Sequence, residues 1–230
     1  ITDNKYLKDN HQYIALLRSS GSVEIVKAWL EGDWDIVAGA FFDCWDRAKH
    51  VLKPFSIPQD WTRFRSFDWG SSRPFSVGWW AIANDSEIVP RGALIRYREW
   101  YGMSEPNIGL KLTAEQVAEG IVTRDRDEKF VYSVADPSCW KVDGGPSIAE
   151  RMLQHGILFR RADNQRIAGW DQMRQRFVGL DGKPMLYVFD TCIDSIRTIP
   201  LLQHDETHPE DIDTEMEDHA ADDWRYACMS

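Results

Sequence analysis

The pattern of apolar and polar positions changes near residue 60. Before it, apolar residues recur with helical spacing in three short runs, 13–17, 23–30 and 34–42, which glycines separate. Pro54 and Pro58 then interrupt the pattern, because proline and the residue before it avoid helical geometry. We therefore expect a helical or irregular segment over residues 1–60 and a main domain over residues 61–230.

Three strand-like runs open the main domain, at 62–68, 75–83 and 93–101. Aromatic and branched residues dominate them, and a short polar turn signal, Asn-Asp-Ser at 84–86, separates the second run from the third. A parallel return needs a crossover of about a dozen residues or more. These short connections therefore predict an antiparallel meander.

After the meander, helices and strands alternate. Thr113, with Gln116 three residues later, is a capping box for a helix that extends to Arg126. The further elements that we predict are a strand at 130–135, a helix at 146–155, a strand at 157–160, a helix at 166–178, a strand at 185–189, and helices at 193–202 and 217–229. Three antiparallel strands followed by this alternation predict an α/β fold with a ribonuclease H-like mixed sheet flanked by helices.

Charge is unevenly distributed along the chain. The formal net charge of -10 argues against a nucleic-acid partner only if charge is evenly spread, since phosphate binding needs local lysine and arginine. The stretch 159–183 is rich in arginine, whereas 203–223 is crowded with carboxylates and contains neither lysine nor arginine. The first stretch can hold phosphate and the second can hold metal, although two ordinary solvated faces explain the same pattern.

Several classes of protein find no support in the sequence. The four cysteines form no Cys-x-x-Cys pair and the six histidines no zinc spacing, which favours a reducing, cytosolic compartment and no zinc site. No apolar run is long enough for a membrane span, and residues 1–10 do not resemble a signal peptide. The glycines form no nucleotide-binding loop.

Three aspartates occupy positions at which a sheet can bring them together. Asp68 ends the first strand, Asp136 ends the strand at 130–135, and Asp222 lies on the last predicted helix one turn after Asp218. Taken singly, each is equally well explained as a turn, a helix cap or a solvated face. Together they favour a site at one edge of the sheet, where two Mg²⁺ or Mn²⁺ ions about 3.5 to 4 Å apart would support phosphodiester hydrolysis.

These segments resemble the nuclease portion of the viral terminase large subunit, a DNA-packaging family of tailed phages. The resemblance rests on Phe-Asp-Trp-Gly at 67–70, Ala-Asp-Pro at 135–137 and Asp-His-Ala-Ala-Asp-Asp-Trp-Arg-Tyr-Ala at 218–227. It spans about residues 60–229. The segments 2–4 and 28–35 also resemble the region that joins the packaging ATPase to the nuclease. Residues 1–60 are therefore expected to be the linker to an ATPase domain that this chain lacks.

The resemblance implies roles for particular residues. Asp68, Asp136 and Asp222 would be the catalytic, metal-binding triad, and Asp218 a fourth acidic group at the metal site. Asp222 is chosen over Asp223 because the family places this carboxylate three residues before an arginine, and Asp223 would point about 100° away around the helix. The residues that would grip duplex phosphates are Arg160, Arg161, Arg166 and Lys183.

The resemblance also implies a biological setting. The chain would be a two-metal endonuclease that cuts concatemeric viral double-stranded DNA when genome packaging begins and ends, in the host cytoplasm at the procapsid. Its partners would be DNA, the small terminase subunit, the portal protein and the ATPase domain of the same full-length protein, with no membrane. Two alternatives stay open, a resolvase or transposase-type nuclease of the same fold and a non-catalytic module of a packaging assembly.

Overall fold

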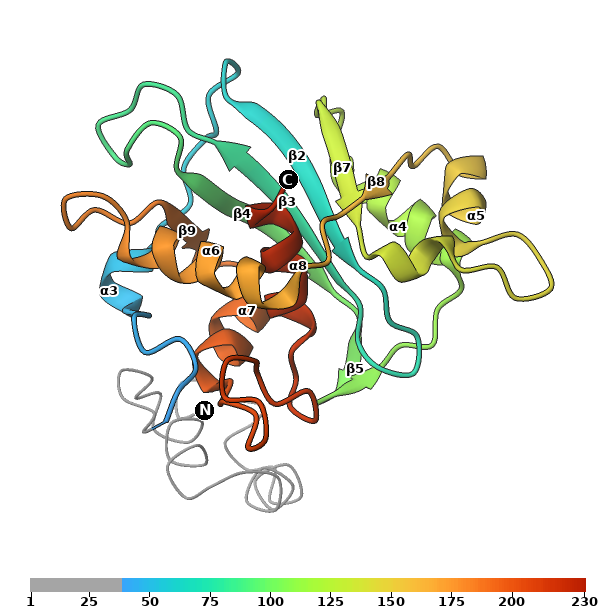
Figure 1. The fold of residues 1–230 in the computed structure, drawn as a ribbon. Coiled ribbons are helices and arrows are strands. Elements are labelled where there is room, and N and C mark those ends of the chain that lie inside the picture. The colour runs from blue at the N-terminus through green and yellow to red at the C-terminus, as the bar shows by residue number, and fades with distance from the viewer. Residues whose placement is uncertain (1–38) are drawn as a thin grey trace, which may run out of the picture.

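A seven-stranded mixed sheet runs through residues 39–230, the part of the chain that this computed structural model describes (Figure 1). Its order is β1-β9-β4-β3-β2-β7-β8. The strands are β1 (Val51–Leu52), β2 (Thr62–Asp68), β3 (Ser76–Ile82), β4 (Leu94–Tyr101), β7 (Tyr132–Ala135), β8 (Arg160–Arg161) and β9 (Leu186–Phe189). A separate hairpin pairs β5 (Met103–Glu105) with β6 (Ile108–Gly109).

The predicted order of antiparallel and parallel pairing is confirmed. Strands β2, β3 and β4 form the antiparallel meander at the centre of the sheet. Strand β7 is parallel to β2, β8 is parallel to β7, β9 is parallel to β4, and β1 is parallel to β9. Parallel strands therefore extend the meander on both sides, as in a ribonuclease H-like fold.

Helices cover both faces of the sheet (Figure 1). The helices are α3 (Arg47–His50), α4 (Ala114–Asp125), α5 (Ile148–Gln154), α6 (Arg166–Val178), α7 (Ile193–Thr198) and α8 (His219–Cys228), with 3-10 turns η1 (Pro137–Trp140) and η2 (Ile199–Leu201). Helices α4 and α5 lie on one face, and α6, α7 and α8 lie on the other. Neighbouring tryptophans on β3 show this division, because Trp79 bonds Asp125 at the end of α4, whereas Trp80 packs against Trp224 of α8.

The differences from the predicted elements concern short segments. The strand expected at 157–160 is instead the two-residue β8, and the helix expected at 193–202 divides into α7 and η2, which contains Pro200. The described end of the apolar run at 34–42, which was expected to be helical or irregular, is a turn, and residues 34–38 lie outside the described residues. Four features were not predicted: α3, β1, the β5-β6 hairpin and η1.

Residues 39–60, the described end of the expected linker, contact the rest of the structure closely. Strand β1 is an edge of the main sheet. Phe41 and Phe42 are buried against Trp170 of α6, and the Phe41 amide donates to the Leu202 carbonyl at 2.6 Å. The division of the chain near residue 60 stays a prediction, and these contacts argue against it. The linker-like segments at 2–4 and 28–35 lie outside the described residues.

Helix α8 is packed into the core, between the sheet and α6. Trp224 is fully buried, its ring meets Trp80 edge to face at 5.2 Å between centroids, and its indole N–H donates to Ser195 Oγ at 3.0 Å. Phe177 of α6 lies 6.0 Å from the same ring. Trp224 thus fixes α8 against the sheet, and with it the acidic residues at the beginning of α8. Of the helices described from residue 39 onward, none is both long and apolar enough to span a membrane.

We predict that Trp224→Ala lowers the free energy of unfolding by about 3 to 5 kcal/mol, because it leaves a large cavity and removes the hydrogen bond from the indole to Ser195. Urea denaturation measures the change. Val178→Ala at an exposed position of α6 is the control and should change the free energy by less than about 0.5 kcal/mol. Equal effects of the two substitutions would contradict this packing.

Candidate functional site

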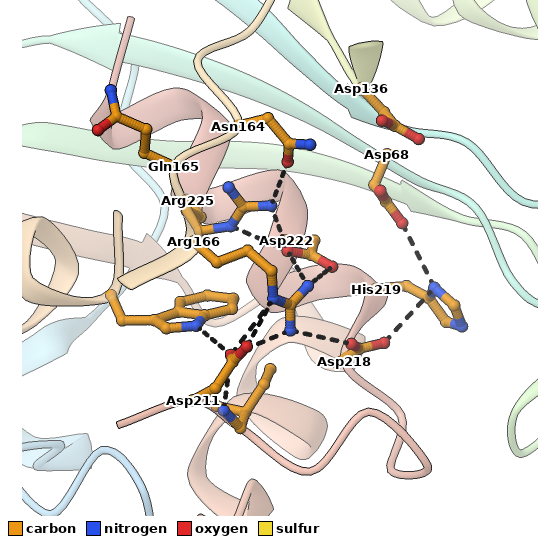
Figure 2. A network of polar contacts seen from close by, with 12 residues as sticks. Asp68, Asp136, Asn164, Gln165, Arg166, Asp211, Asp218, His219, Asp222 and Arg225 are labelled. Carbon is orange, nitrogen blue, oxygen red and sulfur yellow. Dashed lines mark hydrogen bonds and ion pairs between the residues drawn. The ribbon is translucent and has the colours of Figure 1, made fainter. Parts of the chain in front are cut away.

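Asp68 and Asp136 lie at the ends of two neighbouring parallel strands. The register pairs Phe67 of β2 with Ala135 of β7, so the two aspartates follow at equivalent positions. The backbone amide of Asp136 donates to the Phe67 carbonyl at 2.9 Å, which continues the ladder by one bond. Matched residues of parallel strands project from the same face of a sheet. The two carboxylates therefore project to the same side (Figure 2).

Asp68 is buried among other acidic groups. It is 6% exposed, and its Oδ2 lies 3.3 Å from Nδ1 of His219. Within residues 39–230, no lysine or arginine forms an ion pair with Asp68 or Asp136. Burial raises the pKa of Asp68 well above its usual range, and the charges of Asp222 and Asp136 raise it further. A cation at this edge of the sheet would relieve that repulsion.

Asp136 also has a local structural role. It caps the turn η1, where its Oδ1 accepts from the Ser138 amide at 2.9 Å and its Oδ2 accepts from the Ser138 hydroxyl. Pro137 ends the strand there because it has no N–H for the ladder. These bonds fix the carboxylate of Asp136 beside Asp68. Asp136 can therefore cap the turn and belong to the site at the same time.

The beginning of α8 brings two more carboxylates to the same edge. Asp218 is the N-cap residue, and Asp222 lies one turn later, with its amide bonded to the Asp218 carbonyl at 2.9 Å. Both are largely buried, at 7% and 8% exposure. The partial positive charge of a helix N-terminus favours such groups. Burial nevertheless raises the pKa of Asp218 to about 7, with Asp222 as the second cause.

Asp222 and its neighbour Asp223 face different surroundings. Asp223 is fully buried in the core, where its Oδ2 accepts from Arg96 Nη1 at 2.5 Å and from Ser76 Oγ at 2.8 Å. Asp222 instead points to the site and contacts Arg166 and Arg225 (Figure 2). The helix therefore presents Asp222, and not Asp223, beside Asp68, and Asp222 is the residue that the resemblance singled out.

Arg166 is the first residue of α6 and contacts three carboxylates. Its Nε lies 3.0 Å from Asp211 Oδ2, its Nη1 lies 3.2 Å from Asp222 Oδ2, and its Nη2 lies 3.9 Å from Asp218 Oδ2. Burial acts to lower the pKa of Arg166, but Asp222 and Asp211 outweigh it, so the net shift is upward. Arg166 was expected to bind a DNA phosphate. In this structure its guanidinium is instead bound to acidic residues of the same chain.

The other three residues expected to grip DNA do not form one patch with Arg166. Arg160 and Arg161 are exposed on β8, where Arg161 is paired with Ala135, the residue before Asp136. Lys183 is exposed beyond the opposite end of α6, roughly 20 Å along the helix from Arg166. Of these four residues, only Arg160 and Arg161 are exposed on the strand next to the acidic edge.

Four further residues belong to the site and were not predicted as part of it. Arg225 donates to Asp222 Oδ1 from Nε at 2.9 Å and from Nη2 at 2.7 Å, and Nη2 also donates to Asn164 at 3.2 Å. Asp211 binds Arg166 and accepts from the Trp170 indole at 2.7 Å. His219 contacts Asp68, with 3.3 Å between its Nδ1 and Oδ2 of the aspartate. The sequence did hold signals for three of them, since Asp211 lies in the acidic stretch 203–223, and His219 and Arg225 lie in the segment 218–227 that carries the resemblance.

The donor set suits a hard divalent cation, although the side chains are not arranged around one. The carboxylates of Asp68, Asp136, Asp218 and Asp222 lie near one another at one edge of the sheet, and Mg²⁺ and Mn²⁺ prefer oxygen ligands (Figure 2). In the described part of the chain, no three His, Cys, Asp or Glu side chains form a group that could already hold an ion. Both oxygens of Asp222 instead contact guanidinium groups.

Comparison with solved structures shows the same fold in phage terminases. The large terminase of a thermophilic bacteriophage in complex with ADP aligns with a TM-score of 0.66 and 21% identity, over 98% of this chain and 51% of that one. The P22 large terminase nuclease domain aligns with a TM-score of 0.62 and 18% identity, over 84% of this chain and 92% of that domain.

A third similar structure is the large terminase nuclease of the thermophilic phage G20c with bound cobalt, at a TM-score of 0.54 and 12% identity, over 84% of this chain and 98% of that one. This chain spans about half the length of the ADP-bound large terminase. No protein-family model and no curated protein sequence matches the chain. At these identities the similarity establishes the fold.

We predict that Asp218→Asn stabilises the metal-free protein in a pH-dependent way. The folded-state pKa of about 7 lies above the unfolded value near 3.9, so the folded form holds this proton more tightly. The stability that the proton provides is complete below about pH 4 and is lost as the pH rises through 7. The gain from asparagine should therefore grow across that window, to on the order of 2 kcal/mol.

Urea denaturation in EDTA at pH 5 and pH 8 tests the prediction, with Asp171→Asn on the exposed side of α6 as the control. A gain from Asp218→Asn that is equal at the two pH values would contradict the assigned pKa.

Proposed function

We propose that this chain is a metal-dependent DNA endonuclease of the terminase large-subunit type. The proposal rests on one observation. Asp68 and Asp136, from adjacent parallel strands, lie near Asp222 and Asp218 from the start of α8. The proposal is supported by a fold shared with the P22 and G20c nuclease domains. The catalytic, metal-binding triad is Asp68, Asp136 and Asp222, and Asp218 is the fourth acidic group.

Two Mg²⁺ or Mn²⁺ ions are the cofactors of this proposal. Bound ions would supply an activated water and would stabilise charge on the oxygens that attack and leave phosphorus. The cobalt in the G20c nuclease structure is consistent with divalent ions in this fold. The chain contributes the acidic ligands, and His219 orients Asp68 through the 3.3 Å contact between them. Burial lowers the pKa of His219, so its imidazole is neutral near pH 7.

The proposed substrate is double-stranded DNA, approached from the β8 side of the site. Arg160 and Arg161 are exposed one strand away from Asp136 and would contact phosphates without reading sequence. Such binding weakens steeply as salt rises. Lys183 lies beyond the far end of α6 and so does not share this surface, and Arg166 would contact phosphate only after releasing Asp222.

The proposed setting is genome packaging in the host cytoplasm, at the procapsid. The chain would cut concatemeric viral DNA at the start and end of packaging, together with a small terminase subunit, the portal protein and the ATPase domain of the full-length protein. The correspondence with about half of the ADP-bound large terminase supports a separate motor portion. A resolvase or transposase-type nuclease would use similar acidic groups on branched DNA or DNA ends, and a non-catalytic packaging module would bind without cutting.

Plasmid cleavage with Mg²⁺ or Mn²⁺ tests the proposal. We predict that Asp68→Asn, Asp136→Asn and Asp222→Asn each lower the cleavage rate by at least about 100-fold, because each removes a proposed metal ligand. Asp171→Asn, an exposed aspartate of α6, should cut like the wild type. Circular dichroism on each variant shows whether it remains folded.

Three results would contradict the proposal in different ways. Cleavage retained by all three variants would exclude this edge of the sheet as the active site. Binding of plasmid with no metal-dependent cutting by the wild type would favour the non-catalytic module. A rate that is much higher on four-way junctions than on linear duplex would favour the resolvase.

A further inference from the structure

Asp222 is held by two guanidinium groups that differ in their freedom to move. Arg225 contacts Oδ1 twice, at 2.9 and 2.7 Å, while Arg166 contacts Oδ2 at 3.2 Å. These contacts occupy the oxygens through which Asp222 would hold a cation. A divalent ion that binds Asp222 must therefore compete with these two guanidinium groups for its lone pairs and against their positive charge.

Arg225 is poorly placed to withdraw. It is 1% exposed and also bonded to Asn164. Its side chain lies so close to α6 that a Cβ added at Gly169 would come within 2.3 Å of the Arg225 Cγ. Moving this side chain would require α6 and α8 to separate, which would disturb the core.

Arg166 has the freedom that Arg225 lacks. It begins α6, its side chain is 28% exposed, and its contact with Asp218 is long, at 3.9 Å. Its strongest contacts are to Asp211, at 3.0 Å from Nε to Oδ2 and 3.2 Å from Nη2 to Oδ1. The Trp170 indole holds Asp211 in place by donating to Oδ1 at 2.7 Å. Arg166 can thus release Asp222 by a rotation of its terminal bonds while Asp211 keeps it nearby.

We infer that Arg166 is an internal counter-ion that competes with a divalent cation for the α8 side of the site. This inference rests on the proposed function. In the metal-free protein, Arg166 partly neutralises Asp222 and Asp218 and so reduces the repulsion between these two buried carboxylates. Binding of a cation there displaces Arg166 toward Asp211 and solvent, where its guanidinium becomes available to a DNA phosphate. Arg166 therefore affects cation binding through its contact with Asp222.

Mn²⁺ binding to the DNA-free protein, followed by electron paramagnetic resonance, tests this inference without using activity. We predict that Arg166→Gln tightens Mn²⁺ binding on the α8 side of the site, beside Asp222, about tenfold, because the competing charge is gone. Arg73→Gln is the matched control, since Arg73 is an exposed cation near His219 that forms no ion pair with a carboxylate in the described residues. It should change the dissociation constant by less than about twofold, in proportion to long-range charge alone.

Arg166→Lys keeps the test decisive if the glutamine variant does not fold. An ammonium cannot bridge Asp211 and Asp222 as the planar guanidinium fork does. The lysine variant should therefore show Mn²⁺ affinity between that of the wild type and that of the glutamine variant.

Failure of the inference can be distinguished from failure of the proposed function. Wild-type protein that binds Mn²⁺ and cuts DNA, alongside Arg166 variants with equal or weaker Mn²⁺ affinity, would overturn the inference alone. Wild-type protein that binds no Mn²⁺ would overturn the proposed function, and the inference with it.

Discussion

The packing of α8 on the sheet separates two adjacent aspartates into different environments, and the site depends on that separation. Trp224 is buried between Trp80 of β3 and Phe177 of α6, which fixes the rotation of the helix. Asp223 then points into the core and is held by Arg96. Asp222, one position earlier on the helix, necessarily points elsewhere, toward Asp68. The buried ion pair between Asp223 and Arg96 thus helps to fix the rotation of α8, and this rotation sets the direction of Asp222.

The electrostatic consequence is a cluster of like charges that the fold only partly balances. Burial and its acidic neighbours raise the pKa of Asp68, and among the described residues His219 is the only basic group within ion-pair distance of it. On the α8 side, by contrast, Arg166 and Arg225 supply positive charge. The site is therefore asymmetric. Among the described residues, no lysine or arginine forms an ion pair with Asp68 or Asp136, whereas Asp222 is already paired with Arg166 and Arg225. Such an arrangement would admit two metal ions with unequal affinity.

Local signals in the sequence predicted the longer elements, and long-range contacts decided the rest. Helix α6 and strand β2 occur at the predicted residues because their periodic patterns are local. Strands β1 and β8, two residues each, exist only because they pair with β9 and β7. The resemblance implied that Arg166 binds DNA, yet its partners Asp211 and Asp222 lie 45 and 56 residues further along the chain. Only the packing of α6 against α8 brings these charges together.

Anomalous diffraction from a Mn²⁺-soaked crystal tests most directly whether these carboxylates form one metal centre. We predict an anomalous peak within coordination distance of both Asp68 and Asp136, at about 2.0 to 2.3 Å from the carboxylate oxygens. A second, weaker peak should lie beside Asp222, with the Arg166 guanidinium moved away. Absence of any peak at this edge, at a Mn²⁺ concentration that supports DNA cleavage, would contradict the account.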